Sequence, residues 1–157
     1  YQSVYIHGPS ALVRELYDGL TQNGYNPYNE GRALNPQFCQ LVCPMPFEKW
    51  QAPSTKWQGF DVAASYDWRV NNWGTKWDVA DVEIIDKLEV SDEEGPEEVA
   101  WFSFRCWTAW GPPVPVWDKL HAMGIEVQAD YQDEGGMFEG EYHHGEDKCW
   151  QPEEEEA

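Results

Sequence analysis

The sequence lacks long hydrophobic runs and is poor in cysteine. No apolar stretch approaches the roughly 18 residues that a membrane-spanning helix needs, so no membrane segment is predicted. No secretion signal is recognised either. The 4 cysteines among 157 residues are too few and too irregularly spaced for a disulfide framework. We therefore expect reduced thiols and a protein that works in the cytoplasm.

The motifs that mark common enzymes are also missing. The sequence has no nucleophile elbow and no phosphate-binding glycine loop, and no pair of acids stands out by its spacing. Cys39, Cys43, His143, His144 and Cys149 invite a zinc interpretation, but adjacent histidines on a strand point to opposite faces. Cysteines that pack as small apolar side chains are the better interpretation. The sequence predicts a protein that is not an enzyme and that needs no metal and no cofactor.

Basic residues are scarce. Lysine and arginine number 10 against 29 aspartates and glutamates, which gives a formal net charge of −19. Residues 78–98 and 126–157 together hold 22 of these 29 acids, whereas the first 77 residues are balanced. Such a charge repels nucleic-acid phosphates and anionic membranes, and it attracts basic protein surfaces. Solubility alone is the alternative explanation.

Aromatic residues, by contrast, are plentiful, and the 10 tryptophans concentrate in two stretches. Residues 66–77 and residues 107–113 together hold five of them, with a glycine and a threonine nearby in each stretch. We interpret the two stretches as facing parts of one aromatic cluster. This cluster is either a core element that ties an insertion to the sheet or a ligand pocket. The residues of the alternative pocket are Trp68, Arg69, Trp73, Lys76, Trp77 and Trp110.

Hydrophobic periodicity predicts one α+β domain over residues 1–145, followed by an acidic tail over residues 146–157. Residues 25–65 are rich in proline and turn residues and form an irregular insertion, with a possible short strand at 38–42. The order strand–helix–strand–strand–helix–strand predicts a ferredoxin-like antiparallel sheet with both helices on one face. The predicted strands are 2–7, 78–90, 97–108, 125–131 and an extra C-terminal one at 137–142, and the predicted helices are 8–24 and 115–124.

Strand alternation also predicts what each face of the sheet carries. Phe102 and Phe104 are expected to face the helices, and the polar residues between them face the other way. Residues on that polar face would form a regular negative lattice, interrupted by two tryptophans and one arginine. The predicted partner-binding residues are Asp81, Glu83, Glu89, Trp101, Arg105, Trp107, Glu126, Asp130, Glu139 and Glu141.

Several motifs resemble those of one known family. Trp-Gly-Thr-Lys-Trp at 73–77 is followed by Thr-Ala-Trp-Gly-Pro-Pro at 108–113, with Leu-Val-Cys-Pro-Met-Pro at 41–46 and Phe-Glu-Gly at 138–140. Over nearly its whole length the chain resembles the YubB-like ferredoxin-like family of plasmids, genomic islands and phages, which has no established activity. The N-terminal strand departs from the family pattern, as does the acidic tail. The resemblance implies a ferredoxin-like fold and an origin in a mobile genetic element, and it names no chemistry.

These observations together predict a non-enzymatic, acidic binding protein of a mobile genetic element. We expect it to inhibit a host nucleic-acid-handling or defence protein, an anti-defence role, through an acidic surface that mimics DNA. The alternative is a module that binds a small molecule or a peptide with its tryptophans. Direct nucleic-acid binding on the sheet is disfavoured, because sheets that do so combine aromatic with basic residues.

Overall fold

The computed structural model describes residues 1–21, 38–44, 62–75, 77–91, 98–109 and 111–151. Lys76, Trp110, most of the predicted insertion and the last six residues of the predicted tail lie outside these ranges. The elements are β1 (Gln2–Pro9), α1 (Ser10–Thr21), α2 (Cys39–Val42), α4 (Val62–Trp73), β2 (Ala80–Val90), β3 (Val99–Trp107), α5 (Val114–Ala122), β4 (Glu126–Gln132), β5 (Glu139–His143) and β6 (Glu146–Trp150).

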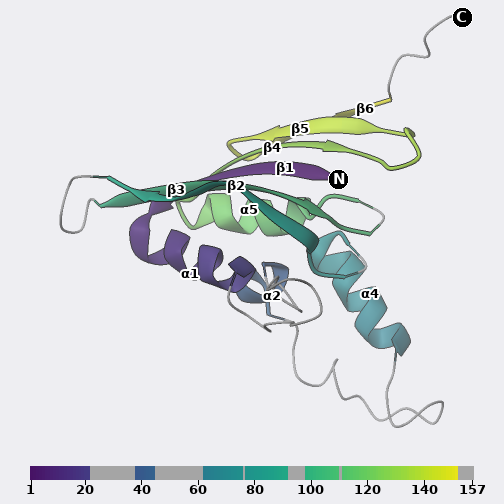
Figure 1. The fold of residues 1–157 in the computed structure, drawn as a ribbon. Coiled ribbons are helices and arrows are strands. Elements are labelled where there is room, and N and C mark those ends of the chain that lie inside the picture. The colour runs from purple at the N-terminus through teal and green to yellow at the C-terminus, as the bar shows by residue number, and fades with distance from the viewer. Residues whose placement is uncertain (22–37, 45–61, 76, 92–97, 110, 152–157) are drawn as a thin grey trace, which may run out of the picture.

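One antiparallel sheet of six strands organises the described residues, in the order β2-β3-β1-β4-β5-β6. Helices α1, α2 and α5 lie on one side of it, and none of the described helices covers the other side (Figure 1). The predicted α+β class and the antiparallel pairing of the second and third strands are confirmed. The arrangement is compatible with a ferredoxin-like fold.

The core lies between the sheet and helices α1 and α5. Period-two alternation on β1, β3 and β4 buries one set of side chains, which includes Phe102 and Phe104 as the sequence predicts. The apolar stripe of α1 and three residues of α5 close the core from below, and each buried aliphatic or aromatic side chain contributes about 1.5–3 kcal/mol. The helix residues buried here are Val13, Leu16, Leu20, Val116, Trp117 and Leu120.

Where the sequence predicts a possible strand over 38–42, Cys39–Val42 form the helix α2 and Phe38 precedes it as the N-cap residue. The carboxylate of Asp78 accepts hydrogen bonds from the N–H groups of Phe38, Cys39 and Gln40, at distances of 2.9 to 3.4 Å. These donors have no partner within so short a helix, and a negative charge is favourable at a helix start. The strand prediction was wrong because Asp78, from a distant part of the chain, caps the start of this helix and so stabilises it.

The second strand is irregular. Three register shifts separate the pairs that β2 makes with β3, so the strand contains extra residues. Ala80 stands opposite Trp107 and Asp86 opposite Ser103, so both lie on the face away from the helices. Strict period-two alternation over the predicted strand 78–90 would put Ala80 on the same face as Ile84, and the register shifts place them on opposite faces. Asp81 lies at the first shift with a φ of 50°, in the left-handed region.

The C-terminal part of the sheet has two strands where the sequence predicts one. Residues 146–150, assigned to the tail in the sequence prediction, form strand β6 and pair with β5. Gly140 on β5 makes this possible, because the ring of Tyr131 crosses the space above it. The Tyr131 hydroxyl donates a hydrogen bond to the carboxylate of Asp147 on β6. The sheet therefore extends beyond the predicted boundary at residue 145.

Candidate functional site

The side of the sheet that faces away from α1 and α5 is the candidate site, and we call it the open face. Its side chains alternate with the buried ones, and the register brings them into rows across the strands. The open face consists of Ser3, Tyr5 and His7 on β1; Glu83, Asp86 and Glu89 on β2; Trp101, Ser103, Arg105 and Trp107 on β3; Glu126, Gln128, Asp130 and Gln132 on β4; and Glu139, Glu141 and His143 on β5.

The centre of the open face is aromatic and carries no acid. Neither β1 nor β3 contains an aspartate or a glutamate. The imidazole of His7 stacks on Trp101 with ring centroids 6.0 Å apart, and it stacks on Tyr5 at 6.5 Å. At the end of the same strands, the ring of Tyr1 lies 5.2 Å from that of Trp107. The acidic lattice predicted from the sequence is therefore divided by an aromatic strip.

The acids lie on the strands that flank this strip. Glu83, Asp86 and Glu89 are on β2, and the others are on β4 and β5. The register places the whole predicted partner-binding set on the open face except Asp81, which is at the β2 bulge. Like charges directly opposite each other destabilise a sheet, and Asp130 stands opposite Glu141. A cation that sits between such carboxylates would relieve this repulsion.

Histidines and one lysine surround the acids of β4 and β5. Glu126 has His144 at 3.4 Å and His7 at 3.7 Å. Burial raises the pKa of Tyr5, and the nearby Glu126 carboxylate raises it further. Within the described residues, Asp130, Glu141 and His143 form the one group whose ligand atoms lie within 4.8 Å of one another, close enough for a metal ion. Asp130 and His143 are exposed to solvent and Glu141 is half-buried, and Lys148 stands opposite Glu141.

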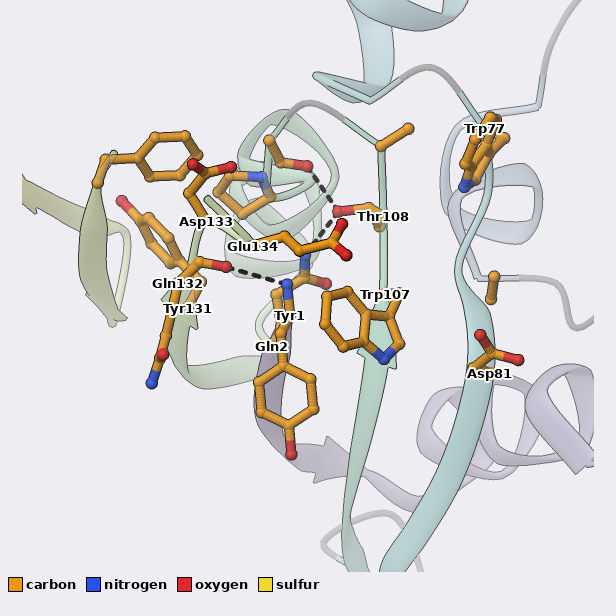
Figure 2. A pocket seen from close by; sticks show the side chains of 15 residues that line it. Tyr1, Gln2, Trp77, Asp81, Trp107, Thr108, Tyr131, Gln132, Asp133 and Glu134 are labelled. Carbon is orange, nitrogen blue, oxygen red and sulfur yellow. Dashed lines mark hydrogen bonds between the residues drawn. The ribbon is translucent and has the colours of Figure 1, made fainter. Parts of the chain in front are cut away.

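A cavity of about 550 Å³ opens at the end of the sheet where β3 ends and β2 begins, and we call it the indole pocket. In Figure 2, Trp107 lies near the middle of the pocket, with Trp77 and Asp81 on one side and Asp133 and Glu134 on the other. The described lining is Tyr1, Gln2, Trp77, Ala80, Asp81, Trp107, Thr108, Ala109, Gly111, Pro112, Tyr131, Gln132, Asp133, Glu134 and Phe138.

Hydrogen bonds hold the wall of the pocket that follows β3. The side-chain amide of the buried Gln2 donates to the Thr108 hydroxyl, which donates to the Gly111 carbonyl oxygen at 2.6 Å. The hydroxyl of the buried Thr75 accepts a hydrogen bond from the Ala109 N–H at 3.0 Å. The contact between Thr75 and Ala109 joins the two tryptophan-rich stretches of the sequence, since each of these residues belongs to one of them.

Of the described residues of the predicted tryptophan pocket, Trp68, Arg69 and Trp73 do not line this cavity. Trp68 and Trp73 of α4 pack edge to face at 5.7 Å, and the indole N–H of the buried Trp73 donates to the Cys43 carbonyl oxygen. The buried Nε of Arg69 has no hydrogen-bond partner among the described residues, and desolvation lowers the pKa of the guanidinium. Of the predicted pocket residues, Trp77 lines the cavity, while Lys76 and Trp110 lie outside the described residues.

Sequence reasoning missed several residues of the site. Tyr5 and His7 alternate with the buried Val4 and Ile6, so strand parity alone was enough to assign them to the open face. Asp133 and Glu134 gave no such signal, because they lie in the turn between β4 and β5 and reach the pocket only through the fold.

Cys39 and Cys43 lie at the two ends of α2, and the other two cysteines lie on separate strands. All 4 are free thiols: Cys39 begins α2, Cys106 is in β3, and Cys149 is in β6. Burial raises the pKa of Cys39 well above its ordinary value and that of Cys106 to about 12, so both remain neutral thiols in the core.

No helix among the described residues has the length and apolar character needed to cross a membrane.

Comparison of the chain with protein-family models, with curated proteins and with solved structures finds no match.

Proposed function

We propose that this chain is a non-enzymatic binding protein whose open face binds the basic surface of a host protein that handles nucleic acid or acts in defence. By occupying that surface in place of nucleic acid, it inhibits the host protein in the host cytoplasm. With this function we also propose a ferredoxin-like fold of the YubB-like kind and an origin in a plasmid or phage.

The observation that carries the proposal is the arrangement of carboxylates on the open face. Acids follow β2 on one side of the aromatic strip and β4 and β5 on the other. Alternate residues of a strand are about 6.6 Å apart and neighbouring strands about 4.8 Å apart, so the acids on each side of the strip lie within one or two such spacings of another acid. A protein surface that binds phosphates carries lysine and arginine, which such rows attract.

The aromatic strip supports a protein partner in particular. Lysine and arginine side chains are attracted to the faces of tryptophan and tyrosine rings as well as to carboxylates. Trp101, Trp107 and Tyr5 therefore suit the centre of an interface in which cations also reach the flanking acids. An acidic surface needed only for solubility would not require tryptophans in the same rows.

The first test is capture of partner proteins from host-cell lysate. Immobilised chain is exposed to the lysate at low and at high salt, retained proteins are identified by mass spectrometry, and the dissociation constant of a purified partner is measured. The open-face variant Glu83→Gln/Glu89→Gln/Asp130→Asn is compared with a matched variant, Glu15→Gln/Asp18→Asn/Asp67→Asn, whose exposed acids lie on α1 and α4.

We expect the open-face variant to bind the partner at least about tenfold more weakly and the matched variant to bind as the parent does. The parent should also displace DNA from the partner. Equal affinity of all three proteins at physiological salt would show that the open face is not the binding surface.

The second candidate function is binding of a small molecule or a peptide by tryptophans. The indole pocket favours it, since its volume of about 550 Å³ falls within the range of ligand sites, roughly 300–1,000 Å³. Its residues are those of the cavity, with Trp77 and Trp107, rather than the set predicted from the sequence. A partner protein whose own side chain enters this pocket would satisfy both candidates.

A further inference from the structure

We propose that the indole pocket binds the guanidinium group of an arginine side chain, supplied by the basic partner. This inference rests on the proposed function and specifies which group of the partner is recognised at the end of the open face.

The charge of the pocket selects a cation. Asp81 enters its lining from the start of β2, and Asp133 and Glu134 enter from the turn after β4. None of the described residues that line the pocket is a lysine, an arginine or a histidine. The one cation that the described lining supplies is the amino group of Tyr1, which lies near Asp133 and Glu134 and donates to the Gln132 carbonyl oxygen at 3.0 Å. Three carboxylates therefore share this single amino group, so the binding of a further cation in the pocket is electrostatically favourable.

Two exposed indoles give the pocket a surface on which a planar cation can stack. Trp77 is 48% exposed and Trp107 is 37% exposed, although Trp107 also contacts the ring of Tyr1. Large aromatic side chains that remain this accessible inside a cavity are typical of binding sites. Tryptophan is the side chain whose face attracts cations most strongly.

Arginine fits this combination better than lysine. The guanidinium group is planar, stacks on aromatic rings and offers several N–H donors in a fixed fork, whereas the lysine ammonium is a compact point charge. A group stacked on an indole can still donate sideways to carboxylates, and such charge-assisted pairs are the stronger hydrogen bonds. Asp81 lies on one side of Trp107, and Asp133 and Glu134 lie on the other, so carboxylate acceptors flank this indole (Figure 2).

The pocket is continuous with the open face. Trp107, Ala80 and Gln132 belong both to the pocket lining and to the last row of side chains across the sheet. A basic segment that lies over the aromatic strip therefore reaches the pocket at its end. The cavity is larger than one side chain, so the residues next to the arginine enter it as well.

The test is a titration of the full chain, followed by the indole N–H signals of its 10 tryptophans in NMR spectra. The probe is Nα-acetyl-arginine amide, and the matched neutral probe is the corresponding citrulline derivative, which has nearly the same shape without the charge. Nα-acetyl-lysine amide is the third probe. We expect the arginine derivative to shift the signals of Trp77 and Trp107 with a millimolar dissociation constant, and the citrulline derivative to shift neither.

Two variants separate binding from folding. Asp81→Asn/Glu134→Gln removes two charges from exposed side chains and should weaken arginine binding about fivefold or more while amide spectra stay as in the parent. Trp77→Leu should abolish the response of the Trp107 signal to the probe. Equal binding of the citrulline derivative, tighter binding of the lysine derivative, or unchanged affinity in the charge variant would overturn the inference.

The two proposals can fail separately. If the open-face variant loses the partner but the arginine derivative never binds, the proposed function stands and this inference is wrong. If the arginine derivative binds as expected but the open-face variant keeps full affinity for the partner, the pocket is real and the proposed use of the open face is wrong.

Discussion

At the scale of single residues, two buried tyrosines, one on β4 and one on β5, each donate a hydrogen bond from the hydroxyl group to a carboxylate. Tyr142 is fully buried against Trp117, with ring centroids 5.3 Å apart, and its hydroxyl donates to Asp118 at 2.7 Å. Tyr131 crosses Gly140 to donate to Asp147. The first contact joins β5 to α5, and the second joins β4 to β6.

The substitution Tyr142→Phe removes the hydroxyl and keeps the ring. The variant should lose about 1–2 kcal/mol of unfolding free energy at pH 7, because a hydrogen bond to a charged group is lost. Burial raises the pKa of Tyr142, and the hydrogen bond to Asp118 raises it further. The unfolded chain ionises its tyrosines near pH 10 while the folded chain keeps this proton, so the contribution is complete below pH 10 and declines above it.

Urea unfolding of parent and variant between pH 7 and pH 11 measures this difference. The stability of the parent should fall above pH 10, and the gap between parent and variant should narrow there. A gap that stays constant or widens up to pH 11 would contradict the assignment of the raised pKa to Tyr142.

At the scale of elements, Asp78 links α2 to the start of the chain segment that becomes β2. Its carboxylate accepts hydrogen bonds from three backbone N–H groups of residues 38–40 and from the N–H of Val79. Phe38, held in this way, is buried and packs against Phe104 with ring centroids 5.5 Å apart. The cap therefore positions an aromatic side chain of the core as well as a helix.

Asp78→Ala should destabilise the protein by about 1–3 kcal/mol, because several backbone donors lose their acceptor at once. Asp78→Asn is the matched control, since its amide oxygen can still accept and the loss should be smaller. Thermal or urea unfolding of the two variants gives the comparison. Equal stability of parent and alanine variant would show that water replaces the carboxylate at no cost.

The same elements show how far sequence reasoning reaches. The alternation of Phe102 and Phe104 with polar neighbours fixed the helix-facing side of β3, because that signal is local. The bulges that move Ala80 and Asp86 to the open face are not local, since they depend on pairing with β3. The helix at 39–42 depends on Asp78, far along the chain, so a short apolar run gave no basis for choosing helix over strand.

The candidate site shows the same limit. Strand parity was sufficient for the acids of β4 and β5 and for Trp101 and Trp107, whose faces follow from period two. The indole pocket was not accessible to that reasoning, because segments far apart in sequence form it at the end of the sheet. Neighbouring tryptophans in the sequence were a poor guide, since Trp73 turns into the core and Trp77 does not.

At the scale of the whole molecule, the question is whether the net charge or its placement attracts a partner. A formal net charge of −19 generates a field around the entire protein, and any basic protein approaches faster at low salt. The open face adds a second contribution, since its carboxylates are held in rows on a fixed sheet beside aromatic rings. The two contributions can be separated because acids also occur on α1 and α4.

The open-face variant and the variant of α1 and α4 separate the effect of net charge from that of its placement. Each of the two triple variants described above removes three of the 29 acids, so both reduce the overall field equally. The association rate constant of the parent with its partner should fall roughly tenfold or more between about 0.05 and 0.5 M salt, as the screening length shrinks from above 10 Å to below 5 Å.

At low salt the open-face variant should have a lower association rate constant than the parent, and this constant should fall less steeply as salt is added. The variant of α1 and α4 should stay close to the parent at every salt concentration. Stopped-flow mixing, followed by tryptophan fluorescence, measures all three rates. If the association rate constants of both variants fall with salt in the same way, the net charge as a whole governs association, and the carboxylates of the open face make no special contribution to it.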